Sequence, residues 1–100
     1  MNLEEAQLKG AVLERAKLHE ANLTKAHVAK ANLRKANLTR ANMQGAVLVD
    51  AELEKADLAG ANLDDAFVLG AHGLTWEQLS QAQNLDKARL PDHLAKARES

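Results

Sequence analysis

Residues 21–40 read ANLTKAHVAKANLRKANLTR, and alanine stands at every fifth position of this stretch. The period extends in both directions without a break, from Ala6 to Ala71. A large apolar residue follows two positions after each alanine up to Ala66, and Leu3 starts the series. These residues are Leu8, Leu13, Leu18, Leu23, Val28, Leu33, Leu38, Met43, Leu48, Leu53, Leu58, Leu63 and Val68. A strict short period of this kind indicates a solenoid.

A period of five fits neither a straight helix nor a continuous strand. On an α-helix five residues advance about 500°, so each repeat would turn the apolar pair by roughly 140°. On a strand an odd period moves the side chain to the opposite face at each repeat. A chain that bends the same way once per repeat keeps every apolar pair on the inside. We therefore expect the alanine and the large apolar residue to face inward, and the other three positions to face outward or lie near the bend.

Segments such as ANLTK (21–25), ANLRK (31–35), ADLAG (56–60) and ANLDD (61–65) resemble the pentapeptide repeat, whose pattern is A(N/D)LXX. The resemblance covers residues 1 to about 71, in 14 successive copies. It implies an all-β solenoid, a right-handed parallel quadrilateral β-helix with four repeats in each coil. The 14 repeats then give about 3.5 coils. Burial of one large apolar residue per repeat, worth about 1.5–3 kcal/mol each, would provide the core.

Large apolar residues at outward positions support a coil of twenty residues independently of the resemblance. Four of the five recur at that interval, and the exception is Val12. Val47 and Phe67 are twenty positions apart, and so are Val49 and Leu69. The same interval relates four asparagines, Asn2, Asn22, Asn42 and Asn62, but this signal is weaker because Asn32 and Asn37 occupy equivalent positions elsewhere. The four apolar residues are expected to stack on one side of the tower as an exposed patch. The patch is covered either by the C-terminal tail, which we favour, or by another chain.

The composition is that of one small domain without disulfides or a membrane span. The chain has 100 residues, a formal net charge of −1 and no cysteine, and Phe67 and Trp76 are its only aromatic residues. The first residues include Glu4 and Glu5 and enter the repeat at once, which is unlike a signal peptide. No apolar run approaches the length of a membrane span. These features predict a cytoplasmic location.

The segment after the repeat carries the signals of a helix start. Thr75 and Gln78 have the spacing of a capping box, and Leu74 and Leu79 have that of a hydrophobic staple. This pattern predicts a helix from about 76 to 83, beginning at Trp76. We therefore divide the chain into a β-helix, residues 1–71, and a C-terminal helical cap and tail, residues 72–100.

The rest of the tail is expected to complete the cap. Asn84 or Asp86 would end the first helix, and Pro91 suits the first turn of a second short helix that reaches about Arg98. The tail also resembles that of cyanobacterial members of the family. The apolar residues expected to seal the last coil are Leu74, Trp76, Leu79, Leu85, Leu90 and Leu94.

The N-terminal end shows no comparable cap, because the sequence is in phase with the repeat from Met1 onward. The first coil would expose its apolar floor and an unpaired strand edge, which proteins usually protect. One interpretation is that local polar side chains suffice. The other is that a second copy, or another pentapeptide repeat protein, stacks there as a weak dimer. The residues of this candidate surface are Leu3, Leu8, Leu13 and Leu18.

Charge is banded along the predicted axis. Residues 22–41 carry five cations and no acid, whereas residues 42–61 carry four acids against Lys55. The five cations are Lys25, Lys30, Arg34, Lys35 and Arg40. They would fall on all four sides of a square tower, and no aromatic residues lie between them, so a nucleic-acid site is not expected. We expect a solvated belt that pairs with the acidic coil.

Nothing in the sequence indicates an enzyme, a cofactor or a metal. The histidines, His19, His27, His72 and His93, lack the spacing of metal ligands and have no thiol partners. Neither a phosphate-binding loop nor a nucleophile elbow is present. His19 and His27 would lie on opposite sides of the tower. The neighbouring carboxylates Asp64 and Asp65 are expected to point apart at a bend.

Two classes of function remain. The first is a non-enzymatic interaction module that contacts a protein through its open N-terminal end or through the flat apolar face. The second is protection of a topoisomerase (gyrase) by DNA mimicry, which the resemblance implies for some members of the family. Mimicry needs a long acidic rod, whereas this chain is short and close to neutral. We therefore favour the interaction module.

Overall fold

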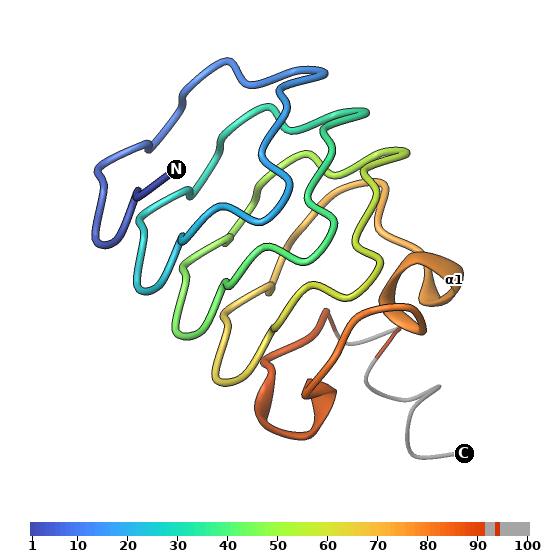
Figure 1. Cartoon of the computed structure of the whole chain (residues 1–100). Coiled ribbons are helices and arrows are strands. Elements are labelled where there is room, and N and C mark those ends of the chain that lie inside the picture. The colour runs from blue at the N-terminus through green and yellow to red at the C-terminus, as the bar shows by residue number, and fades with distance from the viewer. Residues whose placement is uncertain (92–93, 95–100) are drawn as a thin grey trace.

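The computed structural model of the chain describes residues 1–91 and residue 94, apart from the side chain of Asp86. The backbone winds into stacked four-sided coils, with the N-terminus at one end and the cap at the other (Figure 1). Parallel bridges join residues twenty positions apart, and each side of the first coil contributes one. The four bridges are Asn2 to Asn22 on side 1, Gln7 to His27 on side 2, Val12 to Asn32 on side 3 and Lys17 to Asn37 on side 4. Coils 1, 2 and 3 are thus residues 2–21, 22–41 and 42–61, and part of a fourth follows.

Each side contributes a single bridged residue and no longer strand, because the chain turns a corner in every repeat. The turn is closed by the next alanine; for example, Ala36 donates its N–H to the carbonyl of Leu33 at 3.0 Å. The residue just before that alanine has left-handed backbone, with φ of 57–62° where it is not glycine. Those residues are Glu5, Arg15, Glu20, Lys25, Lys30, Lys35, Arg40, Asp50, Lys55 and Asp65.

The core is the column enclosed by the coils, and it confirms the inward assignment. From Leu18 to Val68, every alanine and large apolar residue of the repeat is at most 4% exposed. Leu38 and Met43 are completely buried. None of the described residues with a polar or charged side chain is buried. The inward positions therefore hold apolar side chains alone.

The asparagine of the repeat has a structural role in the turn. Asn37 accepts two hydrogen bonds at Oδ1, one from the backbone N–H of Thr39 at 3.1 Å and one from the Thr39 hydroxyl at 2.7 Å. Such local bonds favour turns over longer strands. Seven residues accept the N–H two positions ahead in this way: Asn2, Asn22, Asn32, Asn37, Asn42, Asp57 and Asn62. The preference for asparagine or aspartate before the leucine follows from this bond.

Helix α1, Trp76–Leu79, starts as predicted but ends earlier. The capping box is present: Thr75 accepts from the N–H of Gln78, and the Gln78 side chain accepts from the N–H of Thr75. The Gln78 amide also donates to the carbonyls of Leu53 and Ala56, at 2.8 and 3.0 Å. The helix therefore binds carbonyls at the top of coil 3.

The predicted continuation of α1 to Gln83 is wrong, because the chain returns to the ladder. The N–H of Gly60 donates to the carbonyl of Gln81 at 2.8 Å. Gln83 then donates to Ala61 at 2.7 Å and forms a parallel bridge with Asn62. Pairing the open backbone of the last coil takes precedence over extending a short helix.

The segment after Asn84 continues the cap over the last coil. Asn84 has left-handed backbone, with φ of 61°, and precedes the 3₁₀ helix η1, Leu85–Lys87, which the sequence did not predict. Arg89 bridges to Phe67, which extends the ladder on side 2.

Most of the expected sealing residues are buried. Leu74, Leu79, Leu90 and Leu94 are at most 5% exposed, and Leu85 packs against the core. Trp76 is 36% exposed and does not seal the coil as expected. The predicted second helix falls mostly outside the described residues, which include only Pro91 and Leu94 of that range.

Candidate interaction surfaces

The lower edge of coil 1 is a row of backbone groups without partners among the described residues. In coil 2 the N–H of Asn22 donates to Met1, and the carbonyls of Asn22 and Thr24 accept from Leu3 and Glu5. The equivalent groups of coil 1 form no such bonds within the described part of the chain. Each of its four repeats therefore presents one free N–H and two free carbonyls at the edge. The N–H groups are those of Asn2, Gln7, Val12 and Lys17.

The apolar floor above this edge is only partly covered. Leu3, Leu8 and Leu13 are half-buried, as expected for the first coil. Leu18 was expected to be half-exposed, but it is only 4% exposed. It is the last leucine of the coil, so the rise of the chain has already carried it above the floor. The predicted surface therefore consists of three leucines rather than four.

The apolar patch lies on side 2, where the sequence placed it. Val47 and Phe67 are joined by a parallel bridge, and Val49 and Leu69 follow them in the same repeats. The two valines are half-buried, whereas Phe67 is 39% and Leu69 42% exposed. Arg89 of the tail places its guanidinium 5.7 Å from the centre of the Phe67 ring. The described part of the tail therefore does not cover the patch as we expected: Arg89 reaches Phe67, but both Phe67 and Leu69 stay exposed.

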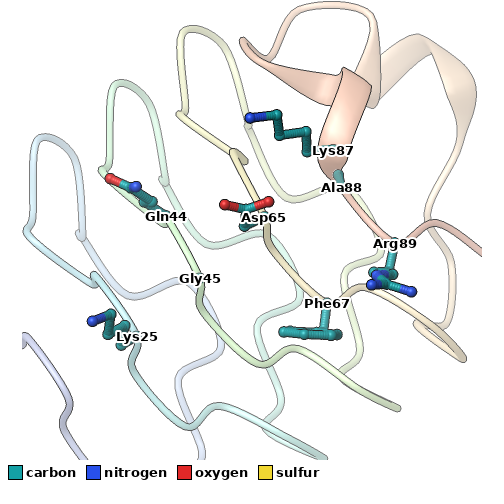
Figure 2. A pocket seen from close by; sticks show the side chains of 8 residues that line it. All are labelled: Lys25, Gln44, Gly45, Asp65, Phe67, Lys87, Ala88 and Arg89. Carbon is teal, nitrogen blue, oxygen red and sulfur yellow. The ribbon is translucent and has the colours of Figure 1, made fainter.

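A groove next to the patch was not found from the sequence. It has a volume of about 720 Å³ and follows the corner between sides 1 and 2 up to the cap. Figure 2 shows the residues that line it: Lys25, Gln44, Gly45, Asp65 and Phe67 from the coils, and Lys87, Ala88 and Arg89 from the tail. The corner column reads Glu5, Lys25, Gly45 and Asp65, one residue per coil. The signal available in the sequence was a glycine, Gly45, between two charged residues of that column, Lys25 and Asp65.

The basic belt of coil 2 surrounds the tower and pairs with coil 3 at one described position. Arg34 donates to Glu52 at 2.9 Å and approaches Glu54 at 3.7 Å. The hydrogen bond and the charge of Glu52 raise the pKa of Arg34. Desolvation lowers it by less, and the charges of Glu54 and Glu14 add still smaller increases. The belt thus lies on all four sides, as expected, and contributes one ion-pair cluster on side 3.

The remaining polar side chains that the structure describes do not cluster as a metal site would require. No group of three potential metal ligands occurs among the side chains that the structure describes. His27 lies on side 2 and His19 follows the bridge of side 4, so the two face opposite directions. In the part of the chain that the structure describes, no helix is long and apolar enough to cross a membrane.

The sequence profile of pentapeptide repeats (8 copies) matches residues 2–40 and 31–68, which make up most of the stacked coils. The chain belongs to the pentapeptide repeat family. Proteins of this family are generally structural and non-enzymatic, and they act as interaction modules. No curated protein matches the chain.

Solved pentapeptide repeat proteins resemble the chain in part. One from the cyanobacterium Cyanothece 51142 is 31% identical, with a TM-score of 0.51 over 90% of this chain and 50% of its own. One from the thylakoid lumen of Arabidopsis thaliana is 27% identical, with a TM-score of 0.46 over 70% of this chain and 52% of its own.

A third structure is HetL of Nostoc sp. Strain PCC 7120, a protein involved in heterocyst differentiation regulation. It is 25% identical, with a TM-score of 0.39 over 88% of this chain and 61% of its own. The chain therefore spans only half to three fifths of the length of the structures it resembles.

Proposed function

We propose that this pentapeptide repeat protein is a rigid scaffold for protein–protein contact and that the edge of coil 1 is a contact surface. The supporting observation is the row of unpaired N–H and carbonyl groups beneath three half-buried leucines. Burial of such groups without partners is costly, so a docked chain must supply complementary groups. Another pentapeptide repeat coil does so, and its own floor would cover the leucines.

The simplest partner is a second copy that meets the first head to head. The cap occupies the opposite end, where Gln83 and Arg89 already pair with the last coil. At the free edge, Asn2 presents both its N–H and its carbonyl, and an antiparallel pair of residues exchanges both of these bonds. A twofold axis produces such pairs and gives a closed dimer. The contact is one coil in cross-section, so a weak dimer is expected.

The expected dimer can be tested by sedimentation velocity over a series of concentrations that reaches the millimolar range. We expect wild-type protein to show a weak, concentration-dependent dimer. The double variant Leu3→Lys with Leu8→Lys should stay monomeric, because two charges would enter the dimer floor. The matched control is Gln7→Lys with Val12→Lys, which adds the same charge to outward positions of the same coil and should dimerise like wild type.

Two results would contradict the proposal. Wild-type protein that remains monomeric at every concentration shows that the edge does not associate. Equal loss of dimer in both double variants shows that added charge, and not the floor, is responsible. Circular dichroism of each variant establishes that the fold is retained.

The finer description of the fold is inferred from the family. We take the coil to be right-handed and quadrilateral, as the resemblance implies. DNA mimicry is not favoured, because it requires an acidic surface and coil 2 carries five cations and no acid.

A further inference from the structure

The groove between sides 1 and 2 combines a hollow with unpaired charge. Gly45 leaves the corner column open between Lys25 below and Asp65 above, and a Cβ at this position would approach Cγ of Lys25 to 3.3 Å. The tail supplies the upper end of the groove through Lys87 and Arg89 (Figure 2). The groove is therefore built jointly by the coils and the cap.

Its charge is positive in a protein whose formal net charge is −1. Three cations, Lys25, Lys87 and Arg89, stand against one acid, Asp65. None of the three cations forms an ion pair with a described side chain, and that of Asp86 is not among the described ones. The guanidinium of Arg89 lies over the Phe67 ring, and its hydrogen-bond donors have no acceptor among the described residues. These donors suit a carboxylate ligand.

The floor of the groove is continuous with the apolar patch. Phe67 lines the groove and also belongs to the apolar patch on side 2, where it is bridged to Val47. An apolar side chain that lay on Phe67 would therefore be next to the patch. The patch still exposes 39% of Phe67 and 42% of Leu69. A ligand that covered both features would need apolar and acidic groups side by side.

We propose that this groove binds an acidic, apolar peptide segment of a partner protein, with its carboxylates at Lys25, Lys87 and Arg89 and its apolar side chains on Phe67 and Leu69. Lys25 stands in coil 2 and Lys87 in the tail, three levels higher, which is roughly 14 Å at about 4.8 Å per level. An extended chain covers that distance in about four residues. The motif is therefore two acidic positions about four residues apart, with leucine-like residues between them.

A nucleic acid fits the same charges less well. Asp65 stands between Lys25 and Lys87 and would repel the continuous charge of a phosphate backbone, whereas the proposed peptide places uncharged residues there. Phe67 is the one aromatic residue among those that line the groove, so successive bases would have a single ring to stack on. A peptide would use all of these groups, because the Asp65 carboxylate can accept a backbone N–H.

Fluorescence anisotropy with the labelled peptide GSDELLDESG, together with NMR mapping of amide shifts, tests the proposal. We expect saturable binding that weakens with salt, with shifts centred on Gly45, Phe67 and Arg89. Lys87→Glu with Arg89→Glu should weaken binding at least about tenfold, because attraction becomes repulsion at two positions. Lys25→Glu, in a different coil, should weaken it in the same direction.

The matched control is Lys35→Glu with Lys55→Glu, which changes the charge equally at the far corner of side 3 and should leave binding unchanged. The proposal is overturned if the peptide shows no saturable binding. Equal loss in both double variants, or tighter binding of GSKKLLKKSG or of a thymidine oligonucleotide, also overturns it. The Leu3→Lys, Leu8→Lys variant should bind the peptide normally, so this result is independent of the end-to-end contact.

Discussion

Coils 1 and 2 share one sequence pattern but have different environments. Leu3, Leu8 and Leu13 of coil 1 are half-buried, whereas the residues stacked on them, Leu23, Val28 and Leu33, are at most 2% exposed. The backbone hydrogen bonds differ in the same way: coil 2 is paired on both edges, and coil 1 is paired on one edge within the described residues. Whether the apolar residues of a repeat are buried therefore depends on the coils above and below it. The sequence of the repeat determines only that it can stack.

The largest expected difference is between matched leucines on side 3. Leu33→Ala should lower the free energy of unfolding by about 2–5 kcal/mol, because it leaves a cavity in a site closed on both sides. Leu13→Ala should cost clearly less, about 1 kcal/mol, because part of that side chain already contacts solvent. Urea denaturation measures both. Equal costs would show that coil 1 is covered in solution.

Overpacking should also destabilise the protein more in coil 2 than in coil 1, with a smaller difference in the free energy of unfolding. Ala26 is completely buried, so Ala26→Leu should cost about 1–3 kcal/mol as the column distorts. Ala6, one coil below, is half-buried, and Ala6→Leu should cost less because the larger side chain can lean toward the open floor. Thermal melts of the two variants give the comparison. A greater loss for Ala6→Leu would contradict it.

The corner between sides 2 and 3 tests the cost of left-handed backbone without a new steric contact. Gly10 has φ of +72°, and a Cβ added there would meet no atom within 4 Å, so Gly10→Ala should cost about 1–2 kcal/mol from left-handed backbone. Lys30 occupies the same corner in coil 2 with φ of 61°, and Lys30→Gly should stabilise the protein by a smaller amount. Denaturant melts should therefore move in opposite directions. A stabilising Gly10→Ala would remove strain as the explanation.

The smallest expected effects concern the turn acceptor on side 4. Asn37→Ala should cost about 0.5–1.5 kcal/mol, because the N–H of Thr39 loses its acceptor. Asn37→Asp keeps the oxygen and should cost less. Lys17 lies directly below Asn37, and Lys17→Asn should stabilise coil 1 by at most a similar amount. Unchanged melting of Asn37→Ala would exclude the turn bond as the reason for asparagine.

Much of the coil could be predicted from the sequence because the repeat is strictly periodic. The position of Val47 and Phe67 twenty residues apart was enough to place both on one side. The turn bonds of asparagine were not foreseen, since periodicity alone does not distinguish a packing role from a hydrogen bond. The early end of α1 was missed for a different reason: Gln83 pairs with Asn62, and this long-range bond overrides the local helix signal.

The candidate interaction surfaces also differ in how much of each could be predicted from the sequence. The open floor followed from the phase of Leu3, but the burial of Leu18 depends on the rise within one coil. The groove depends on where the tail returns, and no local pattern places Lys87 and Arg89 above Asp65 and Phe67. Sequence patterns thus describe the repeating part, and contacts between the cap and the coils require the structure.

The twenty-residue bridge spacing also restricts how such a chain can change its length. Insertion of one repeat into coil 3 ahead of Val47 would rotate everything after it by a quarter turn relative to the coils before it. Val47 would then move away from the side that carries His27, and the groove would lose its alignment with Lys25. Insertion of four repeats would lengthen the tower and return each later side to its original direction. The surface pattern can therefore be reset by gain or loss of five residues, with every inward position still apolar.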